Sequence, residues 1–145
     1  MNGLRLALGG AGCAVLACAA ALHVFWGLGG RTPMLATLPE VGGRAAFHSS
    51  RAATLAVALA LMMACLVLAL RVLGVRIRPV PDQVAVAISW LLAAVFALRA
   101  VGDFRLLGFF KQVVGSRFAA MDTWIYSPVC VLLALAFAVA AMPGR

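Results

Sequence analysis

Four long apolar stretches are the feature of this sequence that most restricts its fold. They cover about residues 4–27, 52–73, 82–101 and 122–142, and each is close to the ~20 residues that a helix needs to cross ~30 Å of hydrocarbon. None shows the strict alternation of a barrel strand, so helices are the expected spanning form. The sequence therefore predicts an all-α, polytopic membrane protein: one domain over residues 1–145, with four transmembrane helices in an antiparallel bundle.

The composition agrees with a membrane protein. Hydrophobic residues make up 66% of the chain and charged residues 11%, against roughly 45–50% and 25% in soluble domains. The 14 glycines and many alanines suit close helix packing, because lipid provides no hydrophobic drive for helices to associate. The net charge of +8 is explained by basic side chains among lipid phosphates. We therefore expect membrane lipids as partners and no nucleic acid, since no basic run is interleaved with exposed aromatics.

Residue types that carry catalysis or bind metals lack the spacing that either chemistry needs. All four cysteines fall inside apolar stretches and form no CxxC pair, which favours packing over redox chemistry. His23 and His48 form no HxxxH or HExxH pattern, and no serine lies in a nucleophile elbow. We expect no metal and no cofactor, and the sequence identifies no catalytic residue.

The first apolar stretch has a second interpretation as a cleaved signal peptide, because Arg5 precedes it and Ala-rich sequence follows. A lipoprotein signal fits poorly, since Leu16 lies where a small or β-branched residue is expected before Cys18. The apolar run also continues to Trp26, a residue type typical of membrane interfaces. We interpret the stretch as the first membrane span.

The connections between the stretches predict how the helices are arranged. The second connection is short and contains Pro79 and Pro81, so the second and third helices should form a hairpin. Residues 27–51 are rich in Gly and Pro, whereas residues 102–122 mix charged and aromatic side chains as an amphipathic interfacial helix does. The fourth helix is expected to begin with Asp122 as N-cap, and Pro128 should kink its first turns.

Four crossings place both chain ends and the Arg76/Arg78 turn on one side of the membrane. The positive-inside rule compares basic residues on the two sides, and five against seven does not decide the orientation. We favour chain ends in the cytoplasm, on the reasoning that internal ion pairs hold basic groups on the other side. The expected location is the cell membrane, as a multi-pass protein of the bacterial inner membrane.

Apart from Asp82, the acidic residues and both histidines gather at the end of the bundle away from the chain termini: His23, Glu40, His48, Asp103 and Asp122. Ionisable groups near membrane depth are costly, so they tend to be paired or functional. Arg99 and Asp103 are four residues apart and predict an (i, i+4) ion pair that pins the end of the third helix. The alternative interpretation is that Asp103, Arg105, Asp122 and His23 line a polar pocket.

Three motifs lie at this polar end: residues 23–30 (HVFWGLGG), residues 99–105 (RAVGDFR) with 108–111 (GFFK), and residues 118–123 (FAAMDT) with 126–128 (YSP). Together they resemble DUF3995, a bacterial family of small four-helix membrane proteins of unknown function. The resemblance spans nearly the whole chain and implies an architecture but no activity. It directs attention to residues already selected by charge and to their neighbours: His23, Trp26, Gly30, Gly102, Asp103, Phe104, Lys111, Asp122 and Pro128.

The leading hypothesis is that the polar end binds a small amphipathic molecule or a lipid head group, with basic groups holding an anion. The candidate ligand-binding residues are His23, Trp26, Arg99, Asp103, Arg105, Lys111, Asp122 and Tyr126. One alternative is an intramembrane isomerase or lipid-modifying enzyme in which His23 and a carboxylate exchange protons. The other is an accessory subunit that packs against a membrane-protein partner through Gly9, Gly10 and Gly12, or a homo-oligomer.

Overall fold

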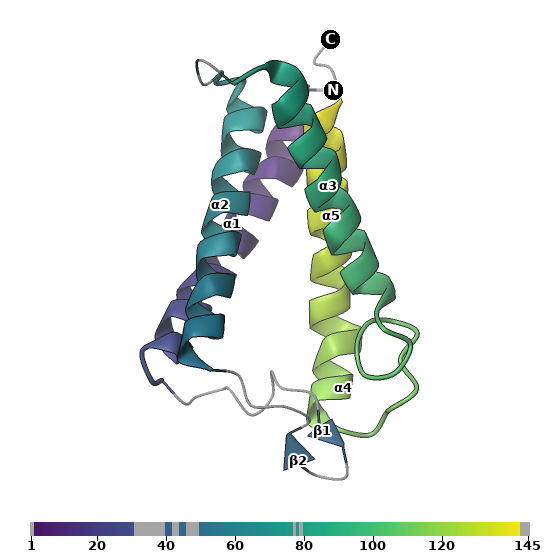
Figure 1. Cartoon of the computed structure of the whole chain (residues 1–145). Coiled ribbons are helices and arrows are strands. Elements are labelled where there is room, and N and C mark those ends of the chain that lie inside the picture. The colour runs from purple at the N-terminus through teal and green to yellow at the C-terminus, as the bar shows by residue number, and fades with distance from the viewer. Residues whose placement is uncertain are drawn as a thin grey trace.

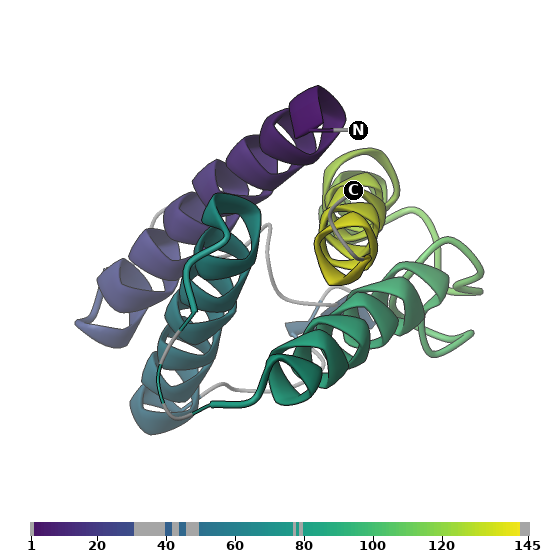
Figure 2. The same ribbon diagram turned by 90° about the horizontal axis from the view of Figure 1, so that it is seen from above.

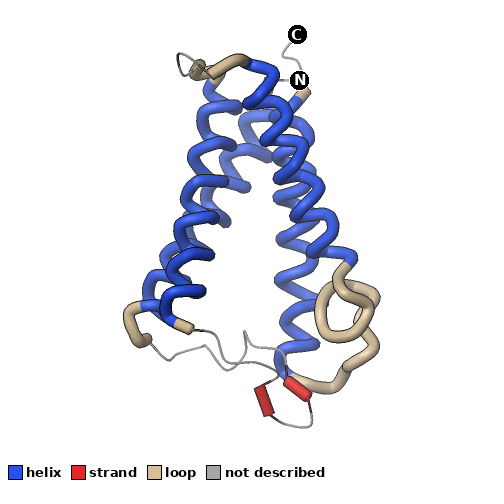
Figure 3. The backbone as a smooth tube through the Cα atoms, viewed as in Figure 1, coloured by secondary structure: helices blue, strands red, loops and turns tan. Residues whose placement is uncertain are grey.

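The computed structural model describes residues 2–30, 40–41, 44–45, 50–76, 78 and 80–142. Within these residues, four helical stretches are each long and apolar enough to cross a membrane (Figures 1 and 3). They are α1 (Asn2–Gly27), α2 (Arg51–Leu73), α3 (Asp82–Val101), and a stretch made of α4 (Arg117–Met121), a π-helical turn (Asp122–Tyr126) and α5 (Ser127–Ala141). Two-residue strands, β1 (Glu40–Val41) and β2 (Arg44–Ala45), pair antiparallel. The predicted all-α fold with four membrane-length helices is confirmed.

The helices form two antiparallel pairs (Figures 1 and 2). α1 runs beside α2, and α3 runs beside α5. The pairs meet at one end and diverge towards the other. We call the first the terminal end, because α1 begins there, α5 ends there and the α2–α3 turn lies there. The other is the loop end, which carries α4 and residues 102–116 (Figure 1).

Local sequence signals set both ends of α2. The Ser50 side chain accepts a hydrogen bond from the Ala53 amide at 3.1 Å, which satisfies one free N–H group of the first turn. Gly74 adopts a φ of 69°, and the Val75 amide donates to the Leu70 carbonyl at 2.9 Å. A left-handed glycine with this hydrogen bond stops a helix. The chain can therefore leave α2 here and begin α3 at Asp82. The two helices diverge from this turn, and each packs mainly on another helix, so the predicted hairpin of α2 and α3 is not a packed pair.

One cluster of buried side chains draws on all four membrane-length helices: Leu16, Ala64, Leu68, Ala93, Leu133, Ala136, Phe137 and Ala140. Phe137 is fully buried and stacks on Phe96 with ring centroids 5.8 Å apart. Alanines make up half of the cluster, because small side chains let helix backbones approach closely. The core thus joins the two helix pairs.

Glycines of α1 serve this internal packing. A methyl group added at Gly9 would overlap the Val72 side chain, and one at Gly12 would lie 2.8 Å from Leu68 Cδ2 and 3.2 Å from Ala136 Cβ. Gly10 has nothing within 4 Å of the same position. The hypothesis that all three glycines form an external interface is therefore wrong for Gly9 and Gly12, which face other helices of this chain.

The third connection is not an amphipathic helix. Residues 102–116 form bends and turns, with Gly102 at a φ of 94° and Gly108 at 82°. The fourth helix begins earlier than predicted, at Arg117, and its N-cap is Ser116, whose Oγ accepts from the Ala119 amide at 3.0 Å. These left-handed glycines turn the chain back on itself, so the helix can start only after the loop.

Asp122 is therefore inside the fourth helix rather than its N-cap. It opens the π-helical turn, in which the Ser127 amide donates to the Asp122 carbonyl. A π-helical turn inserts an extra residue into a helix and changes its hydrogen-bond partners. This lets the helix run on through Pro128, which has no N–H to donate.

Candidate functional site

Asp122 is the centre of the polar cluster at the loop end. Its side chain is fully buried. Oδ1 accepts a hydrogen bond from Arg99 Nη2 at 2.7 Å, and Oδ2 accepts from the Gly108 amide at 2.7 Å and Lys111 Nζ at 3.1 Å. A buried carboxylate needs such partners to offset the loss of water. These contacts tie the end of α3, the 102–116 connection and the fourth helix together.

Lys111 is almost as buried, with 2% of its side chain exposed. Its ammonium group also donates to the Gly108 carbonyl at 2.9 Å and to Thr123 Oγ1 at 2.6 Å. The Thr123 hydroxyl donates in turn to the Ala119 carbonyl at 3.1 Å. Because an ammonium group has three protons, Asp122, Gly108 and Thr123 use all of them. The cluster is closed at Lys111, which has no donor left for a ligand.

Asp103 shapes the connection instead of pairing with Arg99. Its Oδ1 accepts hydrogen bonds from the amides of residues 105–107 at 2.7–3.0 Å. These hydrogen bonds lower the pKa of Asp103, and the one from the Leu107 amide has the largest effect. The predicted (i, i+4) ion pair is wrong, since Arg99 bonds to Asp122. The buried carboxylate requires a countercharge, whereas the exposed Asp103 finds partners in its own backbone.

Two glycines close this loop onto the end of α3. A Cβ on Gly102 would overlap the Leu107 carbonyl oxygen, and a Cβ on Gly108 would overlap Val101 backbone. Both also have the positive φ that favours glycine. The close approach of the two glycines places the Gly108 amide against Asp122.

His23 and Trp26 lie away from this cluster, on α1 in the other helix pair (Figure 1). His23 Nδ1 is 2.8 Å from the Ala19 carbonyl oxygen, and its ring meets Trp26 edge to face with centroids 5.2 Å apart. Within the described part of the chain, no hydrogen bond joins His23 to a carboxylate. The two residues therefore do not complete a site with Asp103 or Asp122.

The other predicted residues lie at the edge of the cluster or beyond it. Tyr126 packs against Phe118, with ring centroids 6.1 Å apart, and Arg105 is exposed. The side chain of Glu40 and all of His48 lie outside the described residues. Of the sequence-predicted set, the structure brings together Arg99, Lys111 and Asp122, with Asp103 shaping the loop beside them. The described residues contain no group of three or more His, Cys, Asp or Glu that could hold a metal ion.

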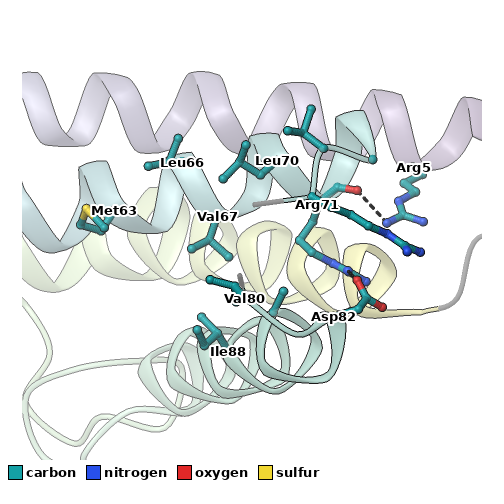
Figure 4. A pocket seen from close by; sticks show the side chains of 13 residues that line it. Arg5, Met63, Leu66, Val67, Leu70, Arg71, Val80, Asp82 and Ile88 are labelled. Carbon is teal, nitrogen blue, oxygen red and sulfur yellow. Dashed lines mark hydrogen bonds and ion pairs between the residues drawn. The ribbon is translucent and has the colours of Figure 1, made fainter. Parts of the chain in front are cut away.

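A pocket of about 630 Å³ lies at the terminal end, between α2 and α3 and beside the start of α1 (Figure 4). Its charged lining consists of Arg5, Arg71, Arg76 and Asp82. The remaining wall is apolar apart from the backbone of Gly74: Met63, Leu66, Val67, Leu70, Val75, Val80, Ala85 and Ile88. Charged and apolar lining are therefore combined in one pocket at this end.

Arg5 and Arg71 are held in place by helix ends. Arg5 Nη2 donates to the Arg71 carbonyl at 2.8 Å and to the Ala140 carbonyl at 3.0 Å, and Arg71 Nε donates to the same Ala140 carbonyl at 3.2 Å (Figure 4). These carbonyls belong to the last turns of α2 and α5, where the helix dipole favours cations. Arg71 Nη1 also pairs with Asp82 at 2.6 Å. A guanidinium group has five N–H donors, so these contacts use only part of each arginine.

The first turn of α3 borders the pocket through Asp82 and Ala85. The N-cap, Pro81, offers no side-chain hydrogen bond. The Val84 and Ala85 amides donate to the Pro81 carbonyl at 3.0 and 3.4 Å, so the amides of Asp82 and Gln83 precede the first hydrogen bonds of the helix. The start of a helix with free N–H groups favours anions.

This pocket was not predicted from the sequence. The sequence indicates only that basic side chains at helix ends lie among lipid phosphates, where cations are usual. The available signal was their number: the terminal end combines several arginines with Asp82 as its acidic residue. Their convergence depends on how α1, α2 and α3 pack, which spacing along the chain does not reveal.

Comparison with known proteins identifies a family without an assigned activity. The family model described as a protein of unknown function, DUF3995, matches residues 16–137. Neither characterised proteins nor solved structures show a significant match. The matched region includes the whole Asp122 cluster and most of the pocket lining. Because the match covers well over half of the chain, the chain belongs to the DUF3995 family of proteins of unknown function.

Proposed function

We propose that this membrane protein binds an anionic amphiphile in the pocket at the terminal end. The observation that carries the proposal is the division of the pocket lining, with guanidinium groups at one end and apolar side chains over the rest. A molecule with a charged head and an apolar tail matches both parts. A wholly polar molecule would leave the apolar wall without a complementary surface.

The charge of the lining favours an anion. Arg5, Arg71 and Arg76 supply three positive charges and Asp82 one negative charge, which leaves a net charge of +2. Guanidinium groups bind phosphate and carboxylate through paired, charge-assisted hydrogen bonds. The neighbouring apolar wall keeps water away and strengthens that attraction.

The depth of the apolar wall fits a lipid-like tail. Along α2 the lining runs from Gly74 to Met63, and eleven residues at ~1.5 Å each correspond to about 16 Å. This is about half of the ~30 Å hydrocarbon core, so a tail here would occupy one leaflet. Met63 and Leu66 are half-exposed, which allows a lipid to enter sideways from the membrane.

Native mass spectrometry of the purified protein tests the proposal, with Ile88→Trp beside the wild type. Ile88 lines the pocket and is 38% exposed, so an indole ring can fill the pocket without disturbing the core. We expect a discrete anionic amphiphile bound to the wild type, either co-purified or after addition of dioctanoyl phosphatidylglycerol, and lost in the variant.

Leu91→Trp is the matched control, because Leu91 lies on the same helix, is 63% exposed and is not part of the lining. It should retain the ligand. The proposal would be overturned if the wild type bound no anionic amphiphile, or if Ile88→Trp retained it as well as Leu91→Trp does.

The geometry favours binding over the intramembrane-enzyme alternative. That alternative requires His23 to exchange a proton with Asp103 or Asp122. His23 lies on α1 with Nδ1 at the Ala19 carbonyl, whereas the carboxylates are bonded within the other helix pair. A proton transfer between them would require these contacts to be broken first.

An accessory subunit is the second candidate function. It is favoured by the closed cluster at the loop end, because the buried Asp122 and Lys111 are bonded to each other and to their own chain, as in a purely structural network. Purification from native membranes in mild detergent separates the two candidates. A stoichiometric partner protein with no bound amphiphile would favour the subunit.

We further propose that the protein lies in the cell membrane, in bacteria the inner membrane, with its terminal end facing the cytoplasm. Arg99 and Lys111 pair with Asp122, which supports the idea that internal pairs offset basic charge on the loop side. Fusions at the C-terminus test the orientation. We expect fluorescence from a fused green fluorescent protein and no activity from a fused alkaline phosphatase, and the reverse result would invert the topology.

A further inference from the structure

We infer that the head group recognised by this pocket is a phosphate monoester carrying two negative charges, so that the occupant is a phosphomonoester lipid rather than a phosphodiester lipid. The inference rests on the proposed function and specifies its ligand. Three observations carry it: the net charge of the lining, the donors that face the pocket, and the length of the apolar wall.

The first observation is the charge balance. The lining has a net charge of +2 after Asp82 is counted against Arg5, Arg71 and Arg76. Asp82 pairs with Arg71 at 2.6 Å and is half-exposed. Its negative charge is therefore already included in the net charge of the lining. A diester with one negative charge would leave one positive charge of the lining without a partner on the ligand, and so would form fewer charge-assisted hydrogen bonds. A dianion compensates both charges.

The second observation is that the hydrogen-bond donors around the pocket come from different segments of the chain. Arg5 lines the pocket, and its hydrogen bonds to the Arg71 and Ala140 carbonyls both come from Nη2. Arg76 is exposed in the α2–α3 turn, and it forms no hydrogen bond or ion pair with the described residues. The first turn of α3, whose Asp82 and Ala85 line the pocket, is a further segment beside the head-group end. A monoester presents three strong acceptor oxygens and suits donors from three segments, whereas a diester has fewer unesterified oxygens.

The third observation is the apolar wall, which distinguishes a lipid from free phosphate. Val67, Val80 and Ile88 lie together to the left of the arginines in Figure 4. Burial of apolar surface stabilises a bound chain by roughly 25 cal/mol per Å². A phosphate without a chain would gain none of this, so the lipid tail is part of what the pocket recognises.

Isothermal titration calorimetry in a neutral detergent at about pH 8 tests the inference with three dioctanoyl lipids. We expect phosphatidic acid, the monoester, to bind about tenfold more tightly than phosphatidylglycerol, and phosphatidylcholine to bind least. Glycerol 3-phosphate carries the same dianion without chains and should show no measurable binding.

Each alternative result has a distinct meaning. Equal affinity for phosphatidic acid and phosphatidylglycerol would overturn the inference and leave the proposed function standing. No binding of any lipid would overturn both. Binding of glycerol 3-phosphate as tight as that of phosphatidic acid would show a phosphate site that ignores the lipid tail, and this would also overturn the inference.

A change of pH provides an independent check. The second pKa of a phosphate monoester is about 6, so at about pH 5 phosphatidic acid carries one charge, as phosphatidylglycerol does. The charged groups that face the head group are Arg5 on α1, Arg71 on α2, Arg76 in the turn and Asp82 on α3. We expect the preference to fall from about tenfold at pH 8 to about twofold or less at pH 5. An unchanged preference would show that head-group size, and not charge, is recognised.

Two neighbouring arginines offer a matched pair of variants. Arg76 lines the pocket, whereas Arg78 is exposed in the same turn and does not. Arg76→Gln should weaken phosphatidic acid binding about tenfold and reduce its preference over phosphatidylglycerol. Arg78→Gln removes the same charge and should change affinity by about twofold at most, because Arg78 does not line the pocket and its more distant charge is screened. Equal losses in both variants would mean general surface attraction and would overturn the inference.

Discussion

Asp122 has a side chain with no solvent exposure and lies near the start of a membrane-length helix. Its partners are Arg99 at the end of α3 and Lys111 and the Gly108 amide in the following connection. None of these is close to Asp122 in sequence, so a single side chain holds three segments at the loop end. The cluster is best understood as the anchor of that end.

Asp122→Asn should therefore lower the free energy of unfolding by about 3–5 kcal/mol, the cost of leaving a buried charge without its partner. Lys111, with 2% of its side chain exposed, would keep its charge with no carboxylate beside it. The measurement is unfolding of the purified protein in detergent micelles, by thermal or dodecyl sulfate titration.

Asp82→Asn is the control for Asp122→Asn. Asp82 also forms an ion pair with an arginine, Arg71, but its side chain is 50% exposed. Water reaches the half-exposed Asp82, and Arg71 keeps its hydrogen bond to the Ala140 carbonyl, so this substitution should cost about 1 kcal/mol. Losses of similar size in the two variants would contradict the anchoring role of Asp122.

The Asp103 loop should respond to acid. Hydrogen bonds from the amides of Leu107, Leu106 and Arg105 hold the pKa of Asp103 below its ordinary value of 3.8. The stabilisation is therefore complete above that value and is lost as the pH falls through the lower pKa of the folded protein. We expect the amides of residues 105–107 to lose protection from hydrogen exchange below about pH 3.8, after correction for the intrinsic rate. Asp103→Asn should remove this transition, and its persistence in the variant would assign it to another group.

At the scale of elements, the helices could be predicted because their limits depend on local features. An apolar length that matches a bilayer defines α2, and Ser50 and Gly74 supply its start and stop. The connection at residues 102–116 could not be predicted in this way. Its shape depends on the contact between Gly102 and the backbone near Gly108, which a composition of mixed charged and aromatic residues does not reveal.

In the candidate sites too, local contacts could be predicted from the sequence and contacts between distant segments could not. Arg99 had two carboxylates available, Asp103 at i+4 and Asp122 on another helix, and spacing along the chain reveals only the first. The choice of Asp122 follows from its burial, which depends on how α3 packs on α5. The pocket at the terminal end is assembled from α1, α2, α3 and the turn between them, so no single stretch of sequence carries its pattern.

Adjacent glycines on α1 test how closely α1 and α2 pack. Gly9→Ala places a methyl group against Val72, whose β-branched side chain has few rotamers to escape into. We expect the free energy of unfolding to fall by about 1–3 kcal/mol. Gly10→Ala meets nothing within 4 Å and should be neutral or stabilising by up to about 1 kcal/mol, because alanine favours helix. Equal behaviour of the two variants in detergent unfolding would contradict the packing of α1 against α2.

At the scale of the whole molecule, the two helix pairs meet at the terminal end and diverge towards the loop end (Figure 1). Arg5 and Arg71 belong to one pair, whereas the Ala140 carbonyl and Asp82 belong to the other. The charged end of the pocket is therefore also the junction between the pairs. A head group bound there would contact both pairs and reinforce that junction.

A ligand at this junction should stabilise the whole molecule. Binding to the folded state alone adds about 2.7 kcal/mol at a ligand concentration of about 100 times Kd, so dioctanoyl phosphatidic acid should raise the unfolding temperature by several degrees in the wild type and in Leu91→Trp, but not in Ile88→Trp. Asp122→Asn should lower the starting temperature without reducing the increment, because distant sites without shared partners contribute additively. Loss of the increment in Asp122→Asn would show instead that the loop end and the pocket form one coupled unit.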